Sequence, residues 1–121
     1  MRDEAAMDDP PLTLHPDERI WLNEYRQAID ERHPGAVVRM AVYGSKARGD
    51  AHEDSDIDVL LIVRNEAAEL KLPLRRIGYR LSATSYAVPS ILAYTQDEWA
   101  SYENLGSAFH EAVERDAVAV L

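Results

Sequence analysis

Two aspartates, Asp56 and Asp58, stand directly before the apolar run from Val59 to Val63. In a strand, residues at i and i+2 leave the same face, so both carboxylates would point the same way. Aspartate is depleted in strands, and two like charges this close raise each other's pKa unless a cation lies between them. Carboxylate oxygens suit Mg²⁺, which takes one or two carboxylates and completes its shell with substrate phosphates. The pair therefore predicts a magnesium site that handles a phosphate compound.

A second pair, Gly44-Ser45, follows another apolar stretch, residues 36–43. A glycine at a strand end lets a ligand approach the backbone, and free N–H groups at the start of a helix favour phosphate. Taken separately, Gly-Ser is compatible with an ordinary turn, and the two aspartates with a solvated strand edge. Their combination, at this spacing and in a strand–helix–strand setting, favours a site for a metal-bound phosphate.

These residues carry a family resemblance. Gly44-Ser45, ten residues, then Asp56-x-Asp58 resembles the signature of the nucleotidyltransferases built on a DNA polymerase β-like core. The longer string GSKARGDAHEDSDIDVLL is similar to the minimal nucleotidyltransferases, many of which are antitoxins encoded beside a HEPN-family toxin. The resemblance implies that Asp56 and Asp58 are catalytic and hold Mg²⁺, and that Gly44 and Ser45 bind the triphosphate of ATP.

The resemblance also bears on the neighbouring residues. Arg48 matches a family position, where it would bind the nucleotide's phosphates or brace the loop, whereas Lys46 is expected in solvent. The loop residues His52, Glu53 and Asp54 are also expected to face solvent. Family members usually bring a third carboxylate from the next strand, but that position falls on Ser90 here, or on Val88 or Pro89 if the register slips. None of these three is acidic, so transfer is predicted to be slow.

The composition describes an ordinary globule. The chain has 121 residues, of which 46% are hydrophobic, and it has no cysteines, so disulfides are excluded. A formal net charge of −9 argues against direct nucleic-acid binding, which needs a basic surface. No apolar run approaches the length of a membrane span and no leader opens the chain, so a cytoplasmic location is expected.

The pattern of the chain predicts one small α/β domain of the α+β type over residues 16–121, preceded by a flexible arm, residues 1–15. A mixed sheet of three to five strands is expected, backed by helices on one side. Trp21 and Tyr25 are expected in the core, not as a base-stacking platform. The predicted strands are 36–43, 56–63, 87–94 and 117–121, and the predicted helices are 16–32, 45–48, one from Pro73, and two after Thr95 separated by Gly106-Ser107. The basic side of the helix from Pro73, formed by Lys71, Arg75, Arg76 and Arg80, is expected in solvent.

Three functions are compatible with the resemblance. The first is transfer of AMP from ATP to a protein hydroxyl, namely a tyrosine of a HEPN-type toxin. The second is a weakened enzyme that acts as a binding-only antitoxin, as the missing third carboxylate would suggest. The third is modification of a small molecule in the manner of aminoglycoside nucleotidyltransferases. It is less favoured because the sequence lacks the second domain that usually forms their acceptor pocket. The sequence does not indicate the oligomeric state.

Overall fold

The computed structural model describes residues 12–50 and 56–120. Apart from η1, which was not predicted, its elements follow the predicted order, with boundaries within a few residues of those expected. They are α2 (Pro16–Arg32), β1 (Val37–Tyr43), α3 (Ser45–Arg48), β2 (Ile57–Val63), η1 (Asn65–Leu70), α4 (Lys71–Ser82), β3 (Pro89–Thr95), α5 (Gln96–Asn104), α6 (Ala108–Asp116) and β4 (Val118–Ala119).

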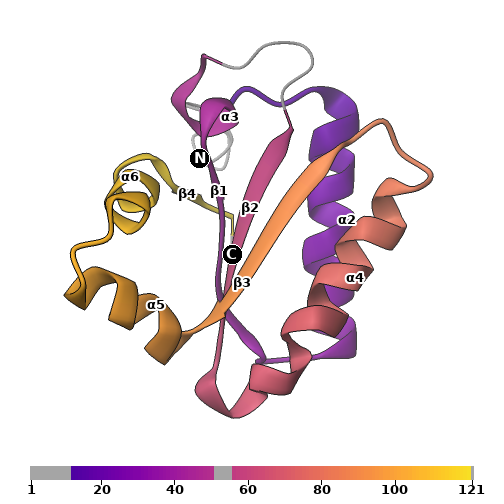
Figure 1. Ribbon diagram of the computed structural model, residues 1–121. Coiled ribbons are helices and arrows are strands. Elements are labelled where there is room, and N and C mark those ends of the chain that lie inside the picture. Colours follow the sequence, from indigo (N-terminus) through magenta and orange to yellow (C-terminus); the bar gives the residue numbers. More distant parts are fainter. Residues whose placement is uncertain (1–11, 51–55, 121) are drawn as a thin grey trace, which may run out of the picture.

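The four strands form one mixed sheet in the order β3-β2-β1-β4. β1 is antiparallel to both β2 and β4, and β2 is parallel to β3. The parallel pair needs a crossover, which η1 and α4 provide along one face of the sheet (Figure 1). The predicted α+β fold with three to five strands is therefore confirmed.

Helices cover both faces of this sheet, so the expectation that they lie on one side was wrong. α2 and α4 lie together against one face, while α5 and α6 lie on the other (Figure 1). Val59 and Leu61 of β2 belong to the core under α2 and α4, whereas Leu60 packs with Trp99 and Val113 of α5 and α6. The cause is the continuous apolar run of β2, because a strand that is apolar on both faces needs cover on both.

Trp21 and Tyr25 lie in the core, as predicted, with exposed fractions of 1% and 0%. The indole Nε1 of Trp21 donates to the carbonyl of Gly78 at 2.9 Å, and the Tyr25 hydroxyl donates to the carbonyl of Leu74 at 2.7 Å. A Cβ on Gly78 would lie 2.8 Å from Tyr25 Cζ, too close for any side chain. These contacts fix α2 against α4, and the two helices together cover one face of the sheet.

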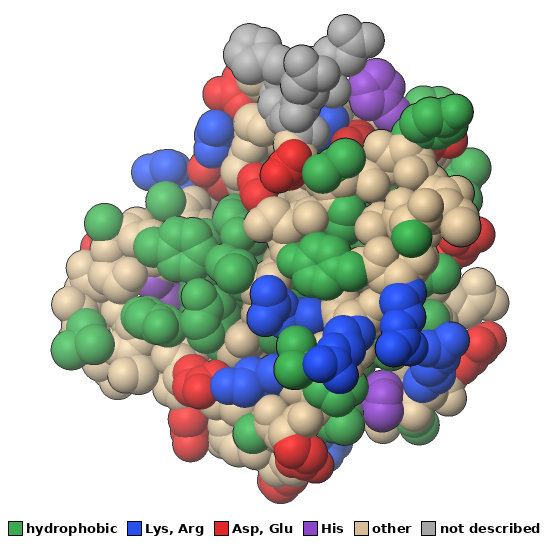
Figure 2. Space-filling view, turned by 45° about the vertical axis from the view of Figure 1, so that its right-hand side comes forward, with side chains coloured by type: hydrophobic (Ala, Val, Ile, Leu, Met, Phe, Trp, Pro, Cys, Tyr) green, Lys and Arg blue, Asp and Glu red, His purple; other side chains and the backbone are tan. Residues whose placement is uncertain are grey.

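Side chains of α4 complete the edge of the sheet. The Arg75 guanidinium donates to the carbonyl of Ile91 at 3.0 Å, and the Ile91 N–H donates to the Tyr79 hydroxyl at 3.0 Å. Arg75 is therefore half-buried and structural, where solvent was expected. Figure 2 shows a gathering of Lys and Arg side chains, and among those of α4, Arg76 and Arg80 are exposed as predicted. β3 is an edge strand and begins at Pro89, as expected. Proline is tolerated there because its missing N–H does not remove a hydrogen bond between strands.

The N-terminal part of the described chain is tied to the domain. Leu12 and Leu14 pack against the core, and the N–H of Thr13 donates to the carbonyl of Lys46 at 2.9 Å. Residues 1–11 of the predicted arm lie outside the described residues. No helix within residues 12–50 and 56–120 combines the length and the apolar character that crossing a bilayer requires.

Candidate functional site

The turn between β1 and α3 is built on Gly44, whose φ of +75° and ψ of −154° fall in a region that only glycine adopts freely. The Gly44 carbonyl accepts the N–H groups of Ala47 and Arg48, both at 3.0 Å, which starts α3. Gly49 ends this single turn at φ +85°. Local sequence thus explains the strand–turn–helix path that was predicted for residues 43–49.

Gly44 and Asp58 are in direct proximity, although fourteen positions separate them in the sequence. Tyr43 pairs with Asp58 across the β1–β2 ladder, which brings the glycine turn beside the start of β2. A Cβ on Gly44 would overlap Asp58 Oδ2 and would lie 3.3 Å from its Cγ. The two halves of the predicted site therefore meet, and the glycine leaves the space that the carboxylate occupies.

The carboxylate pair at the start of β2 is unevenly exposed. Asp56 is exposed, whereas Asp58 is half-buried. Burial raises the pKa of Asp58, the negative charge of Asp56 raises it further, and the positive charge of Arg48 lowers it. A cation would relieve both of the causes that raise this pKa.

The donor set fits a hard cation. Two carboxylates, without cysteine or histidine, match the ligands that Mg²⁺ prefers when substrate phosphates complete its shell. In the described part of the chain, no three His, Cys, Asp or Glu side chains are grouped as a self-sufficient metal site. Asp56 and Asp58 would therefore hold a magnesium ion together with a nucleotide.

Ser90 stands where the third carboxylate was expected. β2 and β3 run parallel with Asp58 aligned to Ser90, so both side chains leave the same face of the sheet. Ser90 is half-buried and cannot act as a charged ligand. Val88 and Pro89, the alternatives for a slipped register, are not aligned with Asp58. Among the residues that the structure describes, the site thus has two of the three acids that its family resemblance implies.

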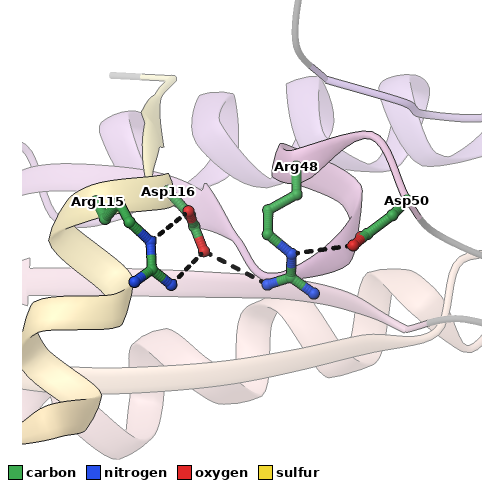
Figure 3. Close-up of polar contacts among 4 residues, drawn as sticks. All are labelled: Arg48, Asp50, Arg115 and Asp116. Carbon is green, nitrogen blue, oxygen red and sulfur yellow. Dashed lines mark hydrogen bonds and ion pairs between the residues drawn. The ribbon is translucent and has the colours of Figure 1, made fainter.

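Arg48 lies on the other flank of the site. Its Nε donates to Asp50 at 3.2 Å, and its Nη1 donates to Asp116 at 3.4 Å, so the guanidinium lies between two carboxylates (Figure 3). Arg115 also donates to Asp116, at 3.2 Å. These contacts are compatible with the loop-bracing role expected for Arg48, and its role in nucleotide binding stays a prediction. Asp116 was missed because no pattern in the sequence links the end of the last helix to this loop.

Lys46 is buried, so the expectation of a solvated side chain was wrong. It is 2% exposed, and its Nζ lies 3.1 Å from Glu18 Oε2. Glu18 is itself buried and also accepts the N–H of His15 at 2.9 Å. The physical reason is that α3 turns position 46 inward, where Glu18 at the start of α2 provides an acidic partner for the long side chain. His52, Glu53 and Asp54 lie outside the described residues.

The fold is a small α+β domain in which the Gly44 turn lies beside the Asp58 carboxylate. The sequence profile of the family described as "Nucleotidyltransferase domain" matches residues 22–105. That range covers the turn, both aspartates and Ser90. The chain belongs to this nucleotidyltransferase family.

Three relatives give the extent of the similarity. A protein named "putative protein adenylyltransferase", from Methanocaldococcus jannaschii, is 37% identical over 41 residues, which cover 34% of this chain and 41% of that relative. The chain therefore matches about two fifths of the length of this curated relative.

The other two relatives are solved structures. A crystal structure of a "putative nucleotidyltransferase" from Sulfolobus solfataricus has a TM-score of 0.54 at 17% identity, over 83% of this chain and 76% of the other. It shows a shared fold. A structure titled "putative minimal nucleotidyltransferase" has a TM-score of 0.47 at 25% identity, over 88% of this chain and 98% of the other.

Proposed function

We propose that this chain binds ATP with Mg²⁺ and transfers AMP to a protein hydroxyl, namely a tyrosine of a HEPN-type toxin, as an antitoxin in the cytoplasm. The observation that carries the proposal is the contact between the Gly44 turn and the Asp58 carboxylate. This arrangement supports the proposal because it would let a phosphate approach the Gly44 backbone beside a carboxylate of the kind that holds magnesium. Membership of the nucleotidyltransferase family supports nucleotidyl transfer as the reaction class. The name of the curated relative, a putative protein adenylyltransferase, supports AMP as the transferred group and a protein as its acceptor.

Each residue of the site has a task in this reaction. The Ser45 hydroxyl and the backbone beside Gly44 bind the triphosphate, and Asp56 and Asp58 hold magnesium against it. The acceptor oxygen attacks the α-phosphorus, a new P–O bond forms, the bond to the β-phosphate oxygen breaks, and pyrophosphate leaves. The acceptor proton passes to solvent or to a base on the partner, because Ser90 is not one. Bound magnesium supplies charge neutralisation for the phosphate oxygens.

Arg48 contributes by holding the loop. Its two ion pairs, with Asp50 and Asp116, keep α3 fixed while the phosphates bind. The positive charge also lowers the pKa of Asp58, which favours the carboxylate form that metal binding needs. Arg48 is therefore a positioning residue in this proposal.

A binding-only antitoxin is the second candidate, and Ser90 is the observation that favours it. Because Ser90, and not an acid, is aligned with Asp58, a second metal has one ligand fewer and β3 offers the acceptor no carboxylate as a base. General-base help is commonly worth a factor of about 10²–10⁴ in rate, so a site of this composition would bind ATP normally and transfer slowly.

Isotope labelling tests the transfer. The protein is incubated with Mg²⁺, a candidate HEPN-type protein, and ATP labelled at either the α- or the γ-phosphate. The proposal predicts that only the α-label becomes attached to the partner's tyrosine, and that Asp58→Asn prevents it. Transfer of the γ-label would identify a kinase. Stable binding of the partner without transfer of either label would favour the binding-only antitoxin.

A further inference from the structure

A cavity of about 510 Å³ lies between β3, the start of α4 and α5. Tyr94 and Tyr102 line it with aromatic rings, and Lys71, Asp97, Glu98 and Ser101 supply polar groups. It is an open depression on the surface, and like small-molecule sites it combines apolar walls with a few polar groups. Figure 2 shows hydrophobic side chains gathered on the α5–α6 side of this face. The proposed reaction assigns no role to the residues that line this cavity.

The cavity and the candidate active site share one face of the sheet, because Tyr94 lines the cavity and leaves the same face as Asp58. Ser90, aligned with Asp58, and Tyr94 are both on β3 and leave the same face, about 13 Å apart at four residues of rise. Between these two positions, Tyr43, Leu92 and Tyr94 all pack against the same cluster, which contains Leu60 and Trp99. A nucleotide whose phosphates lie at Asp58 would reach Tyr94 by extending along this face.

The aromatic wall is ordered by its own packing. The rings of Tyr94 and Tyr102 meet edge to face with centroids 5.3 Å apart, and Trp99 packs against Tyr94 at 5.2 Å. Tyr102 is nevertheless 38% exposed, so it can contact a ligand in the cavity. A pre-positioned, partly exposed aromatic side chain suits a flat heteroaromatic ring.

Some of the polar groups that line the cavity already have hydrogen-bond partners in the described part of the chain, and others do not. Lys71 and Glu98 bind each other at 2.9 Å, and Glu98 also accepts the N–H of Thr95, so both charges are satisfied. By contrast, neither the Asp97 carboxylate nor the Ser101 hydroxyl has a hydrogen-bond partner within residues 12–50 and 56–120. An ionised carboxylate only accepts hydrogen bonds, so its complement is a ligand with N–H donors.

We propose that this cavity is the subsite for the purine base of the nucleotide, with the base packed against Tyr102 and its N–H donors facing Asp97. The inference rests on the proposed function, because the triphosphate must lie at Gly44 and Ser45. A phosphate would not occupy the cavity itself, since two carboxylates line it and Lys71 is already paired. A purine presents both a π-face and N–H donors, and thus fits both parts of the lining.

The test compares ATP with inorganic triphosphate, which lacks the base. Both are titrated in Mg²⁺ against wild type, Tyr102→Ala, Tyr102→Phe and Leu105→Ala. Loss of base stacking should weaken ATP binding by about 5- to 150-fold in Tyr102→Ala. The affinity for inorganic triphosphate should stay within about twofold of wild type. Tyr102→Phe keeps the ring and should bind ATP like wild type. Leu105 is 78% exposed at the end of the same helix and does not line the cavity, so Leu105→Ala is the matched control.

A second variant guards against the case in which Tyr102→Ala lowers ATP affinity only because it disturbs the fold. Asp97→Ala removes the acceptor and should also weaken ATP more than inorganic triphosphate. Unchanged ATP affinity in both Tyr102→Ala and Asp97→Ala would overturn the subsite, as would an equal loss for both ligands. If wild type binds neither ligand in Mg²⁺, the proposed function itself is refuted, and the subsite with it.

Discussion

Replacing Gly44 by alanine perturbs the point on which the site depends. Two costs follow from the structure. The backbone, at φ +75° and ψ −154°, would hold a non-glycine residue in a region that costs about 1–3 kcal/mol. The new Cβ would also displace the Asp58 carboxylate, whose Cγ lies 3.3 Å from it. A side chain forced about 30° from its rotamer costs roughly 0.5–1.5 kcal/mol more.

Gly35 provides the matched control for this variant. It also has a positive φ, +79°, but a Cβ there would meet nothing within 4 Å. Gly35→Ala should therefore carry only its own backbone cost, which should be the same in wild type and in an Asp58→Ala background. In urea denaturation, Gly44→Ala should cost about 0.5–1.5 kcal/mol less in the Asp58→Ala background than in wild type, because the displaced carboxylate is gone.

Nucleotide binding should separate the two glycine variants more sharply. A moved Asp58 carboxylate loses its alignment with the phosphates, so ATP affinity in Mg²⁺ should fall by a factor of about 10 or more in Gly44→Ala. Gly35→Ala should bind ATP like wild type. An equal loss of affinity in both, or a stability cost of Gly44→Ala that is the same with and without the Asp58 carboxylate, would refute the argument that Gly44 makes room for Asp58.

Three further predictions concern stability and rate. Glu18→Gln leaves Lys46 buried without its partner, so the free energy of unfolding measured in urea should fall by about 3–5 kcal/mol, and adding Lys46→Met should restore most of it. Hydrogen bonding from Arg39 holds the pKa of Glu114 below its ordinary value, so the stability this contributes is present at neutral pH and is lost as the pH falls through the folded-state pKa. The melting-temperature difference between wild type and Glu114→Gln should follow that course. Ser90→Asp should speed label transfer by a factor of up to about 10²–10⁴.

Each of these predictions has a result that contradicts it. A Glu18→Gln, Lys46→Met double variant as unstable as Glu18→Gln alone would show that the pair is not the source of the loss. A Glu114→Gln difference that is unchanged in strong acid would exclude the Arg39 interaction as its cause. For that comparison Glu111→Gln, an exposed acid on the same helix, is the control. Fast transfer by wild type, unchanged in Ser90→Asp, would mean that a different group replaces the third acid.

Local signals explain why most of the fold could be predicted. Pro16 begins α2 because its missing N–H is not needed at that position. Thr95 and Glu98 form the predicted capping box, with the Glu98 N–H donating to the Thr95 hydroxyl at 3.1 Å. That anchor, counted back along β3, is also what places Ser90 beside Asp58. These features depend on residues close in sequence, so no knowledge of the folded core was required.

Features that depend on distant partners were not predictable. A lysine in a polar loop is usually solvated, and only Glu18, brought up by α2, makes burial of Lys46 tolerable. Arg75 was likewise expected on a solvated helix face, but its guanidinium donates to the Ile91 carbonyl of the edge strand β3. The cavity at Tyr102 arises from the packing of α5 against the sheet, which no periodicity reveals. One missed feature, by contrast, could have been predicted: helices on both faces of the sheet follow from the run from Val59 to Val63, which is apolar throughout.

Calorimetric titration of ATP tests the central claim most directly, because it measures the site without requiring an acceptor. Wild type and the Asp56→Asn, Asp58→Asn double variant are each titrated in Mg²⁺ and in a chelator. The predicted result is tight binding only for wild type in Mg²⁺, since both the carboxylates and the cation are needed to hold the phosphates. Equal ATP affinity in all four titrations would contradict the assignment of Asp56 and Asp58 to a magnesium–nucleotide site.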